Sequence, residues 1–111
     1  MFQAMKQGAV TVISGSVPLN VEHVPNAQKT CDQCFGKEQP RLVMHLEGVS
    51  LIDSAGLEFL LDLRDRCLQR GGVLQLSAPS LLCRDILQAT GLATQFAIFN
   101  DVNAAVGSFA Q

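Results

Sequence analysis

Apolar and polar residues recur along the chain with two different periods, and the period changes several times. Near the start, residues 2–6 and 9–14 form two segments of strand length, separated by Gln7 and Gly8. Gly8 can supply the positive φ angle that a tight hairpin turn requires. We therefore expect the chain to begin with a β-hairpin.

Four later segments have the apolar spacing of amphipathic helices, i, i+3, i+4 and i+7. Pro25 suits the first turn of the first helix, and Gly36 is expected to end it. Pro79 is expected to open the third helix, and Gly91 to follow it in a left-handed conformation. The last helix is expected to begin at a cap formed by Asn100 or Asp101. The predicted apolar stripes are, in order, Val24, Ala27, Cys31, Cys34 and Phe35; Gly56, Leu57, Phe59, Leu60, Leu63, Cys67 and Leu68; Leu82, Ile86 and Ala89; and Val102, Ala105, Val106 and Phe109.

The segments between these helices are short and mostly apolar, at residues 41–46, 73–77 and 96–99. Such segments suit strands that are covered on both faces of a sheet. The predicted order is β-β-α-β-α-β-α-β-α. Alternation of strands and helices implies parallel neighbours joined by right-handed crossovers. We expect a single α/β domain over residues 1–111, with a mixed sheet of four to five strands and about four helices.

Composition and charge exclude several classes of function. The net charge is −2 and the cations are scattered, which argues against nucleic acid as a partner. No apolar segment approaches the roughly 20 residues that span a bilayer, so direct membrane insertion is not expected. The four cysteines have no secretory context, which favours reduced thiols and a cytoplasmic location.

Cys31 and Cys34 have the spacing of a redox pair or of half a zinc site. A redox pair is expected at a helix N-terminus, where the thiolate is stabilised, but this pair falls near a predicted helix end. A zinc site needs about four ligands, and Cys67 and Cys83 lie on separate segments. We interpret all four residues as thiols of the core, with a metal or redox role as the alternative, and expect no metal and no cofactor.

No arrangement of residues predicts an enzyme. Ser54 with His45 and Asp53 is the one catalytic set that suggests itself, but adjacent residues such as Asp53 and Ser54 cannot easily place a base between them. His45 is therefore expected to have a structural role.

The segment from Leu51 to Leu57 reads Leu-Ile-Asp-Ser-Ala-Gly-Leu and leads into the second predicted helix. Asp53 and Ser54 are both preferred N-cap residues, and either can accept a hydrogen bond from a free backbone N–H. Gly56 falls in the first turn, where alanine would favour the helix by roughly 1 kcal/mol. A glycine there indicates close approach, by a neighbouring strand or by another molecule.

A strand, then Asp-Ser-Ala/Ser-Gly-Leu, then an apolar helix resembles the signature of bacterial anti-sigma-factor antagonists and related STAS domains. The predicted order of elements matches that family over nearly the whole chain. The resemblance implies a non-enzymatic protein-binding switch, in which a partner that is both anti-sigma factor and serine kinase phosphorylates Ser54. The unmodified form would bind that partner, and a phosphatase would reverse the modification. The residues implied in partner binding are Asp53, Ser54, Ala55, Gly56, Leu57 and Asn20.

One loop departs from the family pattern. Many members have Gly-x-Leu/Ile-Asp after the second strand, and the acidic residue lies near the phosphorylation site. Here residues 15–20 read Gly-Ser-Val-Pro-Leu-Asn, and the first carboxylate is Glu22. Asn20 would take the polar role at this position.

Three alternatives follow from the same sequence. Ser54 could serve only as a helix N-cap. The chain could be a non-phosphorylated STAS subunit of a membrane transporter complex that moves a lipid or an anion. It could also be a STAS domain that senses a small ligand or nucleotide.

Overall fold

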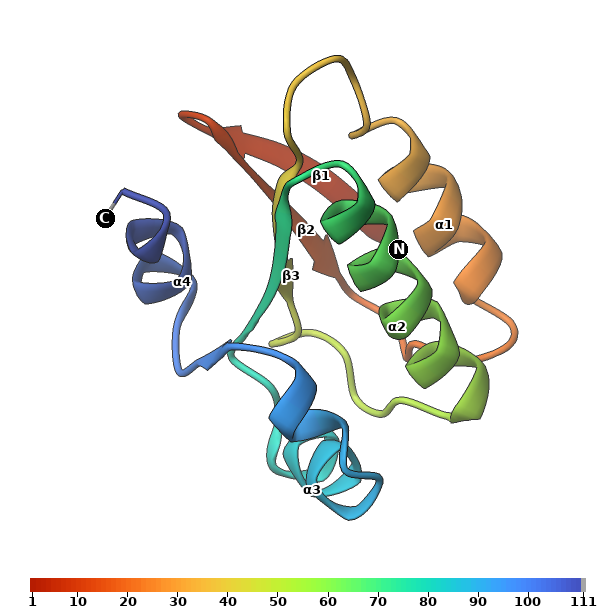
Figure 1. Cartoon of the computed structure of the whole chain (residues 1–111). Helices are drawn as coiled ribbons and strands as arrows, with labels where there is room; N and C mark the ends of the chain where they lie inside the picture. Colours follow the sequence, from red (N-terminus) through yellow and green to blue (C-terminus); the bar gives the residue numbers. More distant parts are fainter. Residues whose placement is uncertain (111) are drawn as a thin grey trace.

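The computed structural model describes residues 1–110 and places a central sheet between helices (Figure 1). The strands are β1 (Phe2–Gln7), β2 (Val10–Gly15), β3 (Arg41–His45), β4 (Val73–Ser77) and β5 (Ile98–Phe99). The helices are α1 (Val24–Asp32), α2 (Ser54–Gln69), α3 (Leu81–Ala89) and α4 (Val102–Ser108), and η1 (Leu92–Gln95) is a short 3-10 helix. This order confirms the predicted α/β class. The predicted domain boundary at residue 111 lies outside the described residues, so the extent of the domain stays a prediction.

The sheet order is β1-β2-β3-β4-β5, with β1 antiparallel to β2 and the other neighbours parallel. Gln7 pairs with Val10, so the hairpin turn is Gly8-Ala9, one residue later than predicted. Gly8 has a φ of 65°, as a tight turn requires. Because β2, β3 and β4 run in the same direction, the loops that follow them meet at one end of the sheet.

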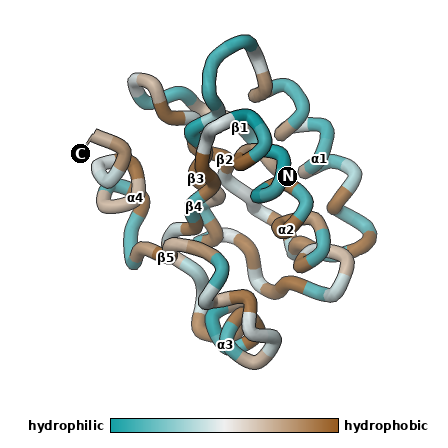
Figure 2. The backbone as a smooth tube through the Cα atoms, viewed as in Figure 1, coloured by the Kyte–Doolittle hydropathy of each residue, from teal (hydrophilic) through white to brown (hydrophobic). Residues whose placement is uncertain are grey.

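Side chains alternate between the two faces of the sheet and build a core on each. Leu42 and Met44 of β3 are buried under α1 and α2, together with Leu60 of α2. Val43 of β3 points to the opposite face and is buried in a smaller cluster with Ala105 of α4. Figures 1 and 2 show the apolar strands enclosed between the α1–α2 layer and α4, with hydrophilic residues along the outer side of α1. The predicted apolar stripe of α4 is confirmed, because Val102, Ala105, Val106 and Phe109 all belong to this smaller cluster.

Two predicted helices differ from the structure. The first was expected to extend to Phe35, but α1 ends at Asp32. The third was expected to bury Leu82 and Ala89, whereas both are exposed and the buried residues of α3 are Cys83 and Leu87. Leu82 and Ile86 have the same four-residue spacing as Cys83 and Leu87, so periodicity alone cannot choose between the two stripes. The start was also misplaced, because the Ser80 hydroxyl caps α3 by accepting the Cys83 N–H.

The packing of α2 leads to a first prediction. Leu60 is fully buried, whereas Leu68, which the predicted apolar stripe of this helix wrongly included, is 51% exposed. Leu60→Ala is expected to lower the free energy of unfolding by about 2–5 kcal/mol, because it leaves a cavity in the core. Leu68→Ala, the matched control, is expected to change it by about 0.5 kcal/mol or less. Urea denaturation followed by circular dichroism measures both, and similar losses in the two variants would contradict this packing.

Candidate functional site

Asp53 is the N-cap of α2 and holds two separate backbone segments with its two carboxylate oxygens. Its Oδ1 accepts the Gly56 N–H at 2.9 Å, and its Oδ2 accepts the Val21 N–H at 3.0 Å. These backbone N–H groups, Gly56 above all, hold the pKa of the Asp53 carboxyl below its usual value, partly against the effect of desolvation. The carboxylate is therefore ionised at neutral pH.

The loop after β2 lies directly against this junction. The Leu19 N–H donates to the Leu51 carbonyl at 2.9 Å, and the Asp53 N–H donates to the Leu19 carbonyl at 3.2 Å. A Cβ atom on Gly56 would lie 2.1 Å from the Leu19 carbonyl oxygen. The close approach that Gly56 indicated is thus made by a loop of the same chain.

Ser54 is the first residue of α2 and is exposed. Asp53 supplies the side-chain cap, so the alternative in which Ser54 serves only as the N-cap is wrong. No hydrogen bond within residues 1–110 occupies the Ser54 hydroxyl. A side chain at this position can meet another molecule without disturbing the helix start.

The other predicted binding residues lie around this point. Ala55 is half-buried and lines a shallow groove of about 220 Å³ between α1 and α2. Leu57 is half-buried against the main core. Asn20 is half-buried, and its Oδ1 accepts the His23 N–H at 3.1 Å at the entry to α1. The contacts of Leu19 and Val21 bring the loop of Asn20 next to the motif, and its part in partner binding stays a prediction.

Two strongly exposed apolar residues were not predicted from the sequence, and one of them lies beside Asp53. Val21 is 72% exposed and Leu81 is 82% exposed. Val21 is hydrogen-bonded to Asp53. Leu81 lies in the first turn of α3. The Cys83 thiol holds this turn to the loop before the motif by donating to the Val49 carbonyl. The sequence signal was the pair Leu81-Leu82, because a helix that buries Cys83 and Leu87 leaves both leucines outside.

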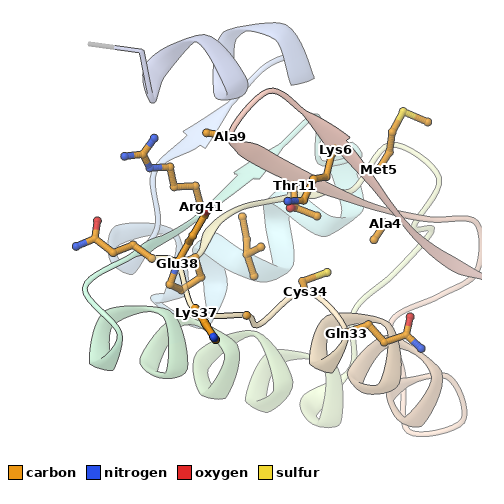
Figure 3. A pocket seen from close by; sticks show the side chains of 14 residues that line it. Ala4, Met5, Lys6, Ala9, Thr11, Gln33, Cys34, Lys37, Glu38 and Arg41 are labelled. Carbon is orange, nitrogen blue, oxygen red and sulfur yellow. The ribbon is translucent and has the colours of Figure 1, made fainter.

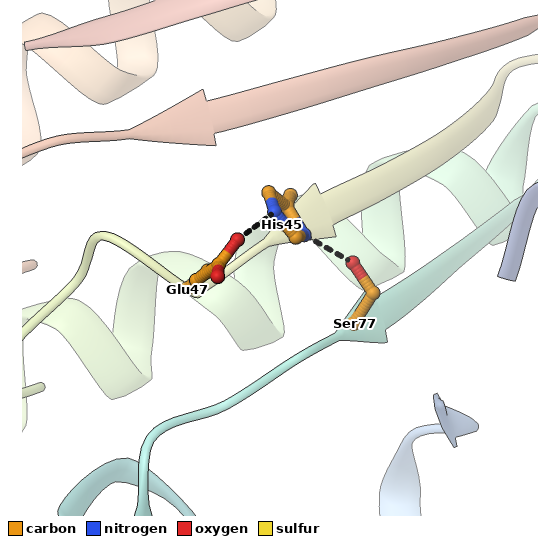
Figure 4. Close-up of polar contacts among 3 residues, drawn as sticks. All are labelled: His45, Glu47 and Ser77. Carbon is orange, nitrogen blue, oxygen red and sulfur yellow. Dashed lines mark hydrogen bonds and ion pairs between the residues drawn. The ribbon is translucent and has the colours of Figure 1, made fainter. Parts of the chain in front are cut away.

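His45 takes part in a chain of polar contacts that does not include Ser54 (Figure 4). Its Nε2 lies 3.2 Å from Glu47 Oε2, and its Nδ1 lies 2.9 Å from Ser77 Oγ. The order Glu-His-Ser is that of a hydrolase triad, but Ser77 is fully buried, so no substrate can reach its hydroxyl. The contacts join the carboxyl ends of β3 and β4, which is a structural role.

The cysteines are unsuited to thiolate chemistry. Burial raises the pKa of the Cys31 thiol to about 12 and that of Cys67 to about 11. Burial also raises the pKa of Cys34, which is half-buried. Thiols with raised pKa values are weak nucleophiles at neutral pH, which favours the core interpretation over the redox one. Within residues 1–110, no three His, Cys, Asp or Glu side chains gather closely enough to hold a metal ion.

The sequence profile of the STAS domain matches residues 1–105. The chain belongs to the STAS domain family. A comparison with curated proteins gives no match. Across the part of the chain that the structure describes, no helix combines the length and apolar character needed to cross a membrane.

The solved structures that resemble this STAS domain include anti-sigma factor antagonists and part of an anion transporter. It is similar to an anti-sigma factor antagonist from Mycobacterium paratuberculosis, with 20% identity over 100% of this chain and 94% of that chain and a TM-score of 0.89. It is similar to the unphosphorylated anti-sigma factor antagonist SpoIIAA, with 19% identity over 99% and 96% of the two chains and a TM-score of 0.78. It also resembles part of the murine anion transporter Slc26a9, with 16% identity over 92% of this chain and 18% of that chain and a TM-score of 0.78. At these identities the likeness shows the fold.

The two-sided use of Asp53 leads to a second prediction. Asp53→Asn retains an oxygen for Gly56 but turns an NH₂ group toward the Val21 N–H, so the variant is expected to be less stable than the parent at neutral pH. Asp101, the N-cap of α4, accepts only the Ala104 N–H through Oδ1. Asp101→Asn is therefore the matched control and is expected to change the stability of the protein little. Urea denaturation midpoints measure both, and equal effects would refute the bridging role.

The same pair has an expected pH dependence. A carboxyl whose folded pKa is depressed contributes stability above its unfolded pKa and loses that contribution as the pH falls through the folded pKa. The difference in the free energy of unfolding between the parent and Asp53→Asn is therefore expected to decrease as the pH falls below 3.8, the ordinary pKa of an aspartate. A difference that increased in acid would contradict this expectation.

Gly56 gives a third prediction. Gly56→Ala is expected to lower the free energy of unfolding by about 1–3 kcal/mol, because Cβ meets the Leu19 carbonyl. A Cβ on Gly107 of α4 would meet no atom within 4 Å, so Gly107→Ala is expected to raise it by up to about 1 kcal/mol. Thermal unfolding compares the two, and a stabilised Gly56→Ala variant would contradict the close approach.

Proposed function

We propose that this STAS domain is a cytoplasmic anti-sigma-factor antagonist of a bacterial partner-switching pathway, controlled by phosphorylation of Ser54. The unmodified chain binds an anti-sigma factor that is also a serine kinase. Phosphorylation releases that partner, and a phosphatase restores binding. The observation that carries the proposal is that Ser54 is exposed at the start of α2 while Asp53, not Ser54, provides the cap.

The surroundings of Ser54 suit a protein partner. Val21 is exposed and hydrogen-bonded to Asp53, so it supplies apolar contact area beside Ser54. The ionised Asp53 supplies a charged group next to Ser54. The structural neighbours named as anti-sigma factor antagonists agree with this class of function.

Charge gives the release mechanism. A phosphate on Ser54 adds about −1.5 to −2 charges. The N-terminus of α2 favours an anion by about 0.3–1 kcal/mol, so the fold tolerates the group. The partner meets a dianion beside the ionised Asp53, and burial of unpaired charge at an interface lowers affinity by about 100-fold or more. Release therefore occurs by electrostatic repulsion and desolvation, with the fold unchanged.

The test mixes the purified chain with its candidate kinase partner and Mg-ATP. Intact-mass and peptide analysis are expected to find one phosphate, on Ser54. Ser54→Ala is expected to accept no phosphate and to keep partner binding, whereas Ser54→Asp is expected to bind at least about tenfold more weakly. Ser50 is exposed four residues earlier, so Ser50→Asp is the matched control and is expected to retain affinity.

A second candidate is supported by the resemblance to the murine anion transporter. In that case the chain is a non-phosphorylated STAS component of a transporter complex. No phosphate on Ser54, together with unchanged partner binding by Ser54→Asp, would defeat the switch and favour this function.

A further inference from the structure

A cavity of about 520 Å³ lies at the other end of the sheet from Ser54. It opens between the β1–β2 hairpin and the segment that joins α1 to β3 (Figure 3). Arg41, the first residue of β3, lines it, whereas Ser54 follows the carboxyl end of that strand. Small-molecule sites in proteins have volumes of about 300–1,000 Å³.

The charged side chains of the cavity are mostly cations. Lys6 of β1 and Lys37 of the joining segment line it, against the single carboxylate of Glu38. Among residues 1–110, neither of these lysines lies within 4.0 Å of a carboxylate. Figure 3 shows Lys6 alongside Thr11 on the hairpin and Lys37 at the margin of the cavity, whereas the guanidinium of Arg41 is directed away from it. Unneutralised like charges in one concave region favour the binding of an anion.

The remaining lining suits a ligand with both a polar and an apolar part. The hydroxyl of Thr11 and the amides of Gln33 and Gln39 can hydrogen-bond to anionic oxygens, while Leu42 and Cys34 provide an apolar side. Burial raises the pKa of the Cys34 thiol, and the positive charge of Lys6 acts in the opposite direction.

One wall of the cavity is fixed in place by α2. The Arg66 guanidinium lies over the ring of Phe35, 4.1 Å from the centroid of that ring. The Arg70 guanidinium donates a hydrogen bond to the Gly36 carbonyl. Arg66 also pairs with Asp32 at 2.6 Å. The segment that carries Cys34 and Lys37 is thus held before any ligand arrives, which lowers the entropic cost of binding.

We propose that this cavity binds a phosphate monoester, with Lys6 and Lys37 as its principal cations. Two ammonium groups match the two negative charges of a phosphate monoester better than the single charge of a carboxylate. Phosphate monoesters occur on soluble metabolites and on lipid headgroups, and the recognition chemistry is the same for both.

The test follows backbone amide resonances of the whole chain during titration with phenyl phosphate, with phenol as the uncharged control. In a second arm, co-sedimentation measures binding to phosphatidylcholine vesicles with and without phosphatidic acid. Saturable shifts are expected at Lys6, Thr11, Cys34 and Lys37 with phenyl phosphate and not with phenol. The Lys6→Gln/Lys37→Gln double variant is expected to bind about tenfold more weakly. Lys29→Gln, at an exposed site outside the cavity, is expected to bind like the parent.

A chemical readout checks the location independently. Cys34 is half-buried and the other three cysteines are buried, so Cys34 is expected to react first with iodoacetamide at about pH 9, where part of a thiol with a raised pKa ionises. Bound phenyl phosphate is expected to slow this reaction in the parent and not in the double lysine variant.

Each outcome decides the proposal. Binding in either arm that depends on Lys6 and Lys37 supports the site, and the arm that responds identifies the source as soluble or lipid-borne. Absence of saturable binding in both arms, or equal loss in Lys29→Gln, would overturn it. The result for Ser54 has no bearing on this test, because neither lysine lies in the switch region.

Discussion

The bridge that Asp53 makes between two backbone segments sets the geometry of the functional end of the molecule. Val21 and Asp53 are 32 residues apart in sequence. The Asp53 carboxylate joins the backbone of Val21 to the first turn of α2. The carbonyl of Leu19 then fills the space that any side chain on Gly56 would occupy. Each residue of an α-helix turns the next by about 100°, so a cap that selects the first residue also selects which face is buried. Burial of Leu60 and Leu63 under the sheet depends on that choice.

The sequence predicted α2 well because three local signals agree. A cap residue, a first-turn glycine and an apolar stripe all place the helix in the same phase. In α3 two stripes compete, and the choice of Cys83 and Leu87 depends on packing against the loop at Val49, which is distant in sequence. Periodicity therefore chose the wrong face of α3, and with it missed the exposure of Leu81.

Contacts between distant segments explain the other differences. Cys34 and Phe35 continue the spacing of α1 after the helix has ended, because Phe35 is held by arginines of α2. The sequence left the cap open between Asp53 and Ser54 because both are preferred N-cap residues, whereas in the structure Asp53 accepts the Gly56 N–H. Lys6 and Lys37 belong to no motif, and only the fold brings them to one cavity.

Helix α2 connects two separate surfaces. Its first turn displays Ser54, and its last turns hold the cavity wall through Arg66 and Arg70. Sixteen residues at 1.5 Å per residue make a helix about 24 Å long. A macromolecule at one end and a small anion at the other would not compete for space.

The exposure of Ser54 outside the cap also bears on how long a signal lasts. A covalent group at that position meets no hydrogen bond that must first break, so the two chemical forms of the chain would share one fold. Conformational fluctuations of the fold would then neither add nor remove the phosphate. Each molecule would keep its phosphorylation state until an enzyme changes it, so the duration of a response would depend on the balance of kinase and phosphatase activities.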